Sequence, residues 1–284
     1  MKTTISLLMV MLLTAMFCGC STTNKSKAAT TPDAAGVGGQ VEEIMPGMLQ
    51  GYLDMEQQLD SKAFVLPSQA EDSTIQLMDT AWADKMQALR GTHRWDLSAR
   101  DADLHFPAPA DVFSCALGIA VSEEDTPALY MLLWRTMTDI GLAPYSAKNA
   151  YQRERPFMVR GETVCTPQDE EALRKDGSYP SGHTAIGWGW ALILTELAPD
   201  RAEAILARGR TFGESRNVCN AHWYNDVVAG RLVGAAAVAR LHAEDNFLAA
   251  MEAAGEDIAL AREAQLAPTV DCALEAEILA TPLD

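Results

Sequence analysis

Apolar residues recur three and four positions apart through most of the chain, and strand-like alternation is nearly absent. This spacing predicts amphipathic helices. The pattern predicts helices over residues 41–60, 69–89, 110–121, 127–140, 145–154, 181–197, 199–213, 223–242, 243–265 and 271–279. Residues 64–67 are expected to be extended, and residues 91–110 to form an irregular connection. The fold class that follows is all-α, a single-domain helical bundle.

Two helix starts have clear signals. Thr126 is expected to cap a helix that begins at Pro127, where the missing N–H costs nothing. Pro180 disfavours helix before it, and Ser181 can cap the helix that follows. The arginines of the next helix, Arg201, Arg208 and Arg210, are expected to point outward.

The N-terminus reads as an export signal. Lys2 is followed by a mostly apolar run, residues 5–17, which is too short to span a bilayer. Cys18-Gly19-Cys20-Ser21 then looks like a bacterial lipoprotein cleavage site, with Cys20 as the lipidated residue. We expect a signal peptide over residues 1–19, a flexible linker over residues 20–40, and one domain over residues 41–284. An ordinary signal peptide, cut nearby, is the alternative.

The predicted location is therefore the periplasm, with the protein tethered to a membrane through Cys20. The formal charge of -17 and the pI near 4.6 argue against nucleic acid and anionic membrane surfaces as partners, because both are repelled at long range. A small anion could still be the ligand if cations cluster in one part of the protein. Any membrane contact is expected through the lipid anchor alone, and a homo-oligomer is left open.

Four cysteines remain in the predicted body: Cys115, Cys165, Cys219 and Cys272. An even number in an exported chain favours two disulfides, for which three connectivities exist. We favour Cys165 with Cys219, because both flank the motif region, which leaves Cys115 with Cys272. Four buried free thiols are the alternative.

Lys148 and Arg155 lie seven residues apart, so both project to nearly the same side if the helix is continuous. An ammonium and a bidentate guanidinium together suit phosphate oxygens. Such a pair taken alone is more often a solvated face.

Ser181, Gly182 and His183 form a second polar segment. Gly182 lets a ligand approach the backbone, so that the free N–H groups of the first helical turn can point at an anion. A plain helix cap with an incidental histidine is the alternative.

His222 and Asp226 are four residues apart, one above the other on a predicted helix face. The carboxylate can accept the Nδ1–H of the imidazole, which leaves Nε2 unprotonated and nucleophilic. Arg216, six residues before His222, could bind the same anion. An ordinary surface pair is the alternative.

The three segments together are recognisable. Lys148-x6-Arg155-Pro156, Pro180-Ser181-Gly182-His183 and Ser215-Arg216-x5-His222-x3-Asp226 resemble the signature of the type 2 phosphatidic acid phosphatase superfamily, which also contains vanadium haloperoxidases. The longer stretch over residues 177–184 resembles the bacterial class A non-specific acid phosphatases, and the resemblance extends over residues 82–279. Tyr224-Asn225 stands where that family more often has Gln-Ser, which leaves substrate preference in question.

The resemblance implies an acid phosphatase of the acid phosphatase/vanadium haloperoxidase fold that hydrolyses a broad range of small phosphate monoesters. His222 would form a phosphohistidine, Asp226 would orient it, and His183 would protonate the leaving oxygen and then activate water. The residues implied to hold phosphate are Lys148, Arg155, Ser181, Gly182 and Arg216. No metal or other cofactor is expected, activity is expected on the acidic side of neutrality, and transfer to alcohols could be a side activity.

Two other functions are kept as alternatives. One is a vanadium-dependent haloperoxidase, which would hold vanadate with similar residues. The other is an envelope lipoprotein that binds phosphate without turnover. His93, His105 and His242 are not at metal-ligand spacing with another ligand residue, so no structural zinc is expected.

Overall fold

The computed structural model describes residues 41–68, 70 and 72–283. The predicted signal peptide, linker and Cys20 lie outside these residues. Within the described part the chain is almost entirely helical, with one two-stranded hairpin, β1 (Glu43–Met45) and β2 (Met48–Leu49). The α-helices are α1 (Thr74–Met86), α2 (His93–Arg100), α3 (Ser114–Leu117), α4 (Pro127–Leu142), α5 (Tyr145–Tyr151), α6 (Pro156–Arg160), α7 (Glu170–Leu173), α8 (Gly182–Leu197), α9 (Ala202–Val218), α10 (Tyr224–Leu241), α11 (Asp245–Glu263) and α12 (Cys272–Leu279).

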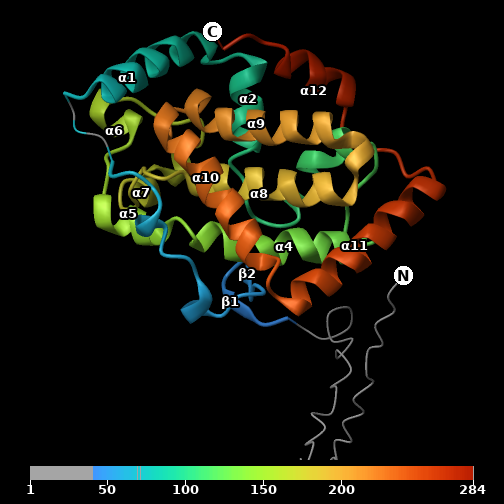
Figure 1. Ribbon diagram of the computed structural model, residues 1–284. Helices are drawn as coiled ribbons and strands as arrows, with labels where there is room; N and C mark the ends of the chain where they lie inside the picture. The colour runs from blue at the N-terminus through green and yellow to red at the C-terminus, as the bar shows by residue number, and fades with distance from the viewer. Residues whose placement is uncertain (1–40, 69, 71, 284) are drawn as a thin grey trace, which may run out of the picture. The chain divides into compact units, whose positions relative to one another are not determined.

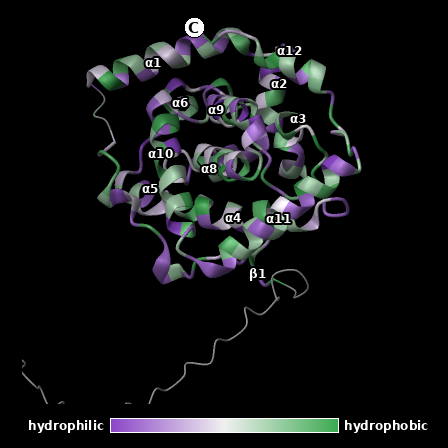
Figure 2. Cartoon of the chain, turned by 45° about the vertical axis from the view of Figure 1, so that its right-hand side comes forward, coloured by the Kyte–Doolittle hydropathy of each residue, from purple (hydrophilic) through white to green (hydrophobic). Residues whose placement is uncertain are grey.

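The central element is α8, the most apolar long helix of the body. It lies between α9 and α4, with α10 crossing in front and α11 packed along α4 (Figure 1). Viewed from the side, α8 is surrounded by the other helices (Figure 2). Trp190 of α8 is fully buried and donates its indole N–H to the Leu133 carbonyl of α4 at 3.1 Å. The all-α prediction is thus confirmed.

Small residues let the helices approach α8 closely. A methyl group added at Gly230 of α10 would stand 2.6 Å from the carbonyl oxygen of Ser181, and one at Gly234 would stand 2.4 Å from that of Ala185. Both distances are below any normal carbon–oxygen contact. The separation of α8 and α10 therefore depends on glycine at these positions.

The helix predicted over residues 41–60 is wrong. Pro46 and Gly47 form the turn of the hairpin, where Gly47 has a φ of +79°, so the helical period is broken after a few residues. The backbone that follows is held by α4: Thr138 donates to the Leu49 carbonyl at 2.7 Å, and Asp139 accepts from the N–H groups of Tyr52 and Leu53 at 2.8 and 3.0 Å. Contacts far away in the sequence therefore decide this segment's conformation.

The connection predicted over residues 91–110 contains a helix, α2, that the sequence pattern did not reveal. Its Arg94 is buried and donates to the hydroxyls of Ser98 and Ser215 at 2.8 and 2.9 Å. Arg208 of α9 is likewise buried, paired with the carboxylate of Asp101, so the prediction that it points outward is wrong. Hydrogen bonds to Arg94 and an ion pair with Arg208 replace solvation in the interior.

Two details near helix ends differ from expectation. Thr126 makes no capping bond to α4; the carboxylate of Asp257 from α11 accepts from the N–H groups of Ala128 and Leu129 instead, at 2.7 and 3.1 Å. The helix predicted over residues 145–154 ends at Tyr151, because Gln152 adopts a left-handed conformation with φ of 43°. Lys148 and Arg155 therefore belong to different helices, α5 and the start of α6.

Both preferred disulfides are present. Cys115 of α3 is bonded to Cys272 of α12, and Cys165 is bonded to Cys219 at the end of α9. The second bond holds the start of the loop that leads from α9 to His222. The predicted pairing is confirmed.

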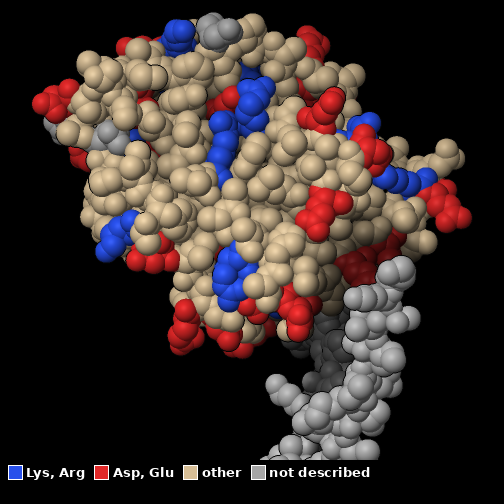
Figure 3. Space-filling model, viewed as in Figure 1, with Lys and Arg blue, Asp and Glu red and all other residues tan. Residues whose placement is uncertain are grey.

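On the face shown in Figure 3, Lys and Arg side chains lie in small groups among Asp and Glu side chains. None of the helices in the described part of the chain is long and apolar enough to cross a membrane.

Candidate active site

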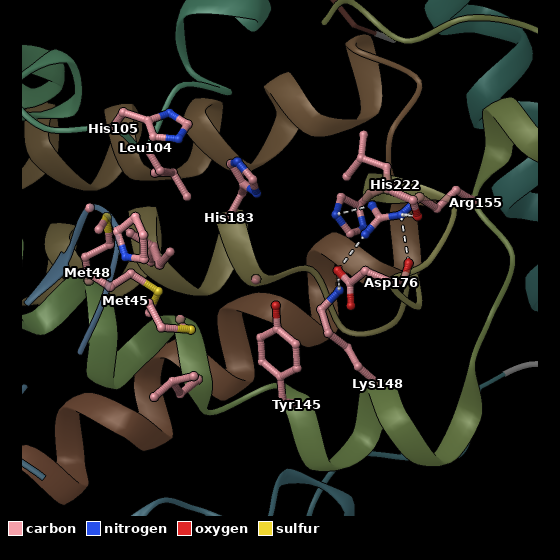
Figure 4. A pocket seen from close by; sticks show the side chains of 18 residues that line it. Met45, Met48, Leu104, His105, Tyr145, Lys148, Arg155, Asp176, His183 and His222 are labelled. Atoms are coloured by element: carbon pink, nitrogen blue, oxygen red, sulfur yellow. Dashed lines mark hydrogen bonds and ion pairs between the residues drawn. The ribbon is translucent and has the colours of Figure 1, made fainter. Parts of the chain in front are cut away.

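A pocket of about 560 Å³ opens between the hairpin, α4, α5 and the start of α8. Five of the residues proposed from the sequence line it: Lys148, Arg155, Gly182, His183 and His222. They come from α5, the start of α6, α8 and the loop before α10. The fold therefore brings together residues that are spread over more than 70 positions of the chain. Figure 4 shows the group of His222, Arg155 and Lys148 on one side of His183.

His222 is buried and lies just before α10, not on a helix face as predicted. The N–H of His222 donates to the Arg216 carbonyl at 3.2 Å, which fixes the loop to the end of α9. Its Nε2 lies 3.0 Å from Nη1 of Arg155. Because a guanidinium nitrogen can only donate, Nε2 carries the lone pair and Nδ1 carries the proton. This is the tautomer that a nitrogen nucleophile requires.

Asp226 lies behind His222, with its Oδ2 3.5 Å from Nδ1 of the imidazole. That distance is long for a hydrogen bond. The carboxylate is fully buried and is held by three donors: the hydroxyl of Ser178, the Trp223 N–H at 2.8 Å, and Nη1 of Arg153 at 2.6 Å. Its charge is therefore fixed beside the imidazole.

Arg153 connects this site to α1. Its Nη2 donates to the carboxylate of Asp79 at 2.6 Å, and Asp79 in turn accepts from the N–H and side-chain amide of Asn225 at 2.9 and 3.0 Å. The arginine thus shares its charge between two buried carboxylates. This arrangement immobilises the first turn of α10, where Asp226 lies.

His183 lies in the first turn of α8. Its Nε2 lies 3.0 Å from the Ala102 carbonyl oxygen, which can only accept, so Nε2 carries a proton and Nδ1 is the nitrogen left to exchange one. Ser181 caps the helix as predicted, since its hydroxyl accepts from the Thr184 N–H at 3.2 Å. The first N–H groups of a helix have no partner within the helix, and those of α8 begin at Gly182 on the pocket wall.

The cations of α5 and α6 meet at one carboxylate that the sequence reasoning missed. Oδ2 of Asp176 accepts from Nζ of Lys148 and from Nη2 of Arg155, both at 2.9 Å (Figure 4). Lys148 also donates to the Gly177 carbonyl. Asp176 itself lines the pocket and is 31% exposed, whereas both cations are buried. The two donors that were assigned to a phosphate are thus occupied by a carboxylate.

Arg216 is the third cation and is 1% exposed. Its Nε and Nη1 are buried and have no hydrogen-bond partner within the part of the chain that the structure describes. Its charge lowers the pKa values of both His183 and His222. Buried donors without partners are costly, and an anion in the pocket could satisfy them.

Burial and positive neighbours shape the protonation of the site. Burial lowers the pKa of His222 well below its ordinary value of 6.5, and the charges of Arg155 and Lys148 lower it further. Burial and Arg216 lower the pKa of His183 in the same way. Burial lowers the pKa of Lys148 to about 8, and that of Arg216 to about 10. Both imidazoles are therefore neutral near pH 7, and the neighbouring charges that lower their pKa values are positive.

Sequence reasoning found the histidines and the three cations but missed Asp176, Arg153, Asp79 and Ser178. Arg153 lies two residues before Arg155, and Asp176 directly precedes the stretch over residues 177–184, which contains Ser178. Their nearness to the motifs was the only available signal. Among the described residues, no group of three or more His, Cys, Asp or Glu side chains is arranged to hold a metal ion.

Comparison with known proteins identifies a family and several similar proteins. The PAP2 superfamily model matches residues 127–245. A non-specific acid phosphatase of Providencia stuartii is 42% identical over 209 residues, which cover 73% of this chain and 84% of that protein. An acid phosphatase of Zymomonas mobilis is 40% identical over 213 residues (74% and 79%), and a non-specific acid phosphatase of Salmonella typhimurium is 38% identical over 211 residues (74% and 84%).

The chain therefore belongs to the PAP2 superfamily. Within that superfamily it is an acid phosphatase similar to the bacterial class A enzymes, as the resemblance had indicated.

Proposed function

We propose that the protein hydrolyses a broad range of small phosphate monoesters through a covalent phosphohistidine. The observation that carries the proposal is the geometry of His222, whose unprotonated Nε2 faces the pocket beside Arg155 while Asp226 lies at Nδ1. Attack on phosphorus requires Nε2 to give up its hydrogen bond to Arg155, whose guanidinium would then hold the phosphate oxygens.

In the first step, Nε2 of His222 attacks phosphorus, the P–N bond forms, and the P–O bond to the organic group breaks. The leaving oxygen takes a proton from His183. In the second step, His183 removes a proton from water, the water oxygen attacks phosphorus, and the P–N bond breaks to release inorganic phosphate. An alcohol in place of water would give phosphoryl transfer by the same route.

The cations stabilise the charge on the transferred group. Lys148, Arg155 and Arg216 would hold the equatorial oxygens together with N–H groups of the first turn of α8, next to Ser181 and Gly182. Arg216 is suited to this role because two of its buried nitrogens lack partners in the described residues. These groups supply positive charge without a metal ion.

The acid optimum expected from the sequence is consistent with the pKa shift of His183. Because its pKa is held well below 6.5, the protonated form that serves as the acid becomes more populated as the pH falls. A bound phosphate dianion raises that pKa again by its charge. We therefore expect the rate of hydrolysis to be greater below neutral pH than above it.

Turnover of para-nitrophenyl phosphate tests the proposal. The wild-type protein should be active with a chelator present, and His222→Ala should lose about a thousandfold or more of kcat, since the nucleophile is gone. His93→Ala, at an exposed position on α2, is the matched control and should retain the rate. An inactive wild type, or an active His222→Ala, would contradict the proposal, and acid-labile, base-stable radiolabel on the protein would identify the phosphohistidine.

We further infer export to the periplasm with a lipid on Cys20, supported by the apolar run at residues 5–17 and by two disulfides, which suit an oxidising compartment. Mass spectrometry of the mature N-terminus distinguishes a lipidated Cys20 from an ordinary cleavage product.

A further inference from the structure

The pocket has two chemically different ends. One end holds the charged group of His222, Arg155, Lys148 and Asp176. Across His183, the other end is formed by the apolar side chains of Met45 and Met48 from the hairpin and of Leu104 (Figure 4). Further apolar lining comes from Met137, Leu142 and Ile186.

In-line attack by His222 determines which end of the pocket receives the organic group of the ester. If His222 attacks in line, the leaving oxygen lies on the side of phosphorus opposite Nε2. His183, which would protonate that oxygen, lies between the two ends (Figure 4). The organic group of the ester is therefore directed away from the cations, toward Met45, Met48 and Leu104. This step rests on the proposed function.

The hairpin is fixed at this position. The carbonyl of Gly47, between the two methionines, accepts from Nε1 of Trp134 at 3.0 Å, and that of Leu49 accepts from Thr138 at 2.7 Å. Both donors belong to α4. Met45 is nevertheless 49% exposed, so its thioether side chain has surface left for a ligand to cover.

We propose that Met45, Met48 and Leu104 form a subsite for an apolar organic group. The subsite makes the enzyme prefer alkyl and aryl phosphate monoesters to the esters of polyhydroxylated alcohols. Methionine side chains are unbranched and polarisable, so they adapt to chains and rings of different shape. Sugar or glycerol hydroxyls placed against them would lose water without gaining partners. His105, the polar residue labelled at this end, has its Nδ1 2.9 Å from the carboxylate of Asp103.

The kcat/KM values for n-hexyl phosphate and glycerol 3-phosphate test the preference. Both are primary alkyl esters, and glycerol is the more acidic alcohol, so a preference for the hexyl ester cannot arise from the leaving group. We expect the hexyl ester to be favoured about tenfold or more, the effect of burying two of its methylene groups. A ratio at or below one would overturn the subsite.

The double variant Met45→Gln, Met48→Gln keeps side-chain length and removes the apolar surface. The hexyl-to-glycerol ratio should fall about fivefold or more, because the loss falls mainly on the hexyl ester. Met78→Gln on α1, where Met78 is 57% exposed outside the pocket, is the matched control and should leave the ratio unchanged. An unchanged ratio in the double variant would also overturn the assignment.

Binding of non-hydrolysable phosphonates separates this inference from the proposed function. Calorimetry should show n-hexylphosphonate binding about tenfold or more tighter than methylphosphonate. If no monoester were hydrolysed while this difference held, the catalytic proposal would fail and the subsite would stand. If monoesters were hydrolysed but the two phosphonates bound equally, the subsite would fail and the catalytic proposal would stand.

Discussion

At the scale of single residues, the site contains a buried lysine whose charged form is disfavoured by the loss of water around it. Lys148 is buried, and its pKa is lowered from the ordinary lysine value of 10.5 to about 8. The desolvation of its ammonium is the largest cause, the neighbouring charge of Arg155 adds to it, and Asp176 opposes both. The cation is therefore present below pH 8 and lost above it.

This shift predicts how anion affinity depends on pH. Sulfate is a suitable probe, because it remains a dianion throughout the range from pH 6.5 to 9.5 and resembles phosphate in shape. Its inhibition constant should be constant up to about pH 8 and then rise toward tenfold per pH unit, as Lys148 loses its proton. Inhibition of para-nitrophenyl phosphate hydrolysis measures it.

The Lys148→Arg variant should move the rise to higher pH, since a guanidinium keeps its proton. Lys175→Arg, on an exposed lysine paired with Glu171, is the control and should leave the profile of the wild type unchanged. A wild-type profile that is flat to pH 9.5 would contradict the assignment of Lys148 to the anion.

The residue types at the site were predictable because chemistry restricts them. A nucleophilic imidazole needs a carboxylate, and a phosphate needs cations and amides, so His222, His183, Lys148 and Arg155 could be proposed from the three motifs taken together, although each motif alone left an ordinary alternative open. Asp176 could not, because its role comes from the two cations that the fold brings to it. A single aspartate before a glycine does not indicate by itself a contact with two cations.

At the scale of helices, strong amphipathic patterns predicted α4, α8, α10 and α11 to within a few residues. Prediction failed where distant side chains decide the backbone, as for the hairpin that α4 holds by Thr138 and Asp139. It failed again at α2, whose buried Arg94 made a polar segment read as a loop. The sequence of a segment does not show which side chains from distant parts of the chain will contact it.

The contact between α8 and α10 predicts the effect of one methyl group. Gly230→Ala would place a carbon 2.6 Å from the Ser181 carbonyl, so the helices must separate or tilt at the end that carries His183 and Asp226. The free energy of unfolding should fall by about 1–3 kcal/mol. kcat/KM should fall about tenfold or more, because small displacements of catalytic groups are costly.

Gly255→Ala on α11 is the matched control. A methyl group there would lie 3.7 Å from Leu197, an ordinary contact, so stability should be unchanged or rise by up to about 1 kcal/mol. Denaturant titration and steady-state kinetics of both variants measure the effects. Equal stability and activity of the two variants would refute the claimed role of Gly230.

At the scale of the whole domain, the positions of the two disulfides predict different effects on stability and on the reaction rate. Cys115–Cys272 links residues 157 positions apart and fastens α12 to α3, and neither cysteine lines the catalytic pocket. Cys165–Cys219 spans 54 positions and ends three residues before His222. The long link restricts the unfolded chain more than the short one does.

Replacing Cys115 and Cys272 by serine should therefore lower the free energy of unfolding by about 2–5 kcal/mol, with kcat retained at temperatures where the variant is folded. Replacing Cys165 and Cys219 should lower kcat as well, because the loop carrying His222 loses its anchor. Thermal unfolding and kinetics of both double variants test this division. Loss of kcat in the folded Cys115→Ser, Cys272→Ser variant would contradict it.

Asp176 gives the pocket an anion of its own. A phosphate that takes the donors of Lys148 and Arg155 exchanges places with this carboxylate, so its net gain is the difference between two anions. If the cations hold phosphate as proposed, the carboxylate would return to Lys148 and Arg155 when the product leaves. This return would favour release of inorganic phosphate from a site with three buried cations.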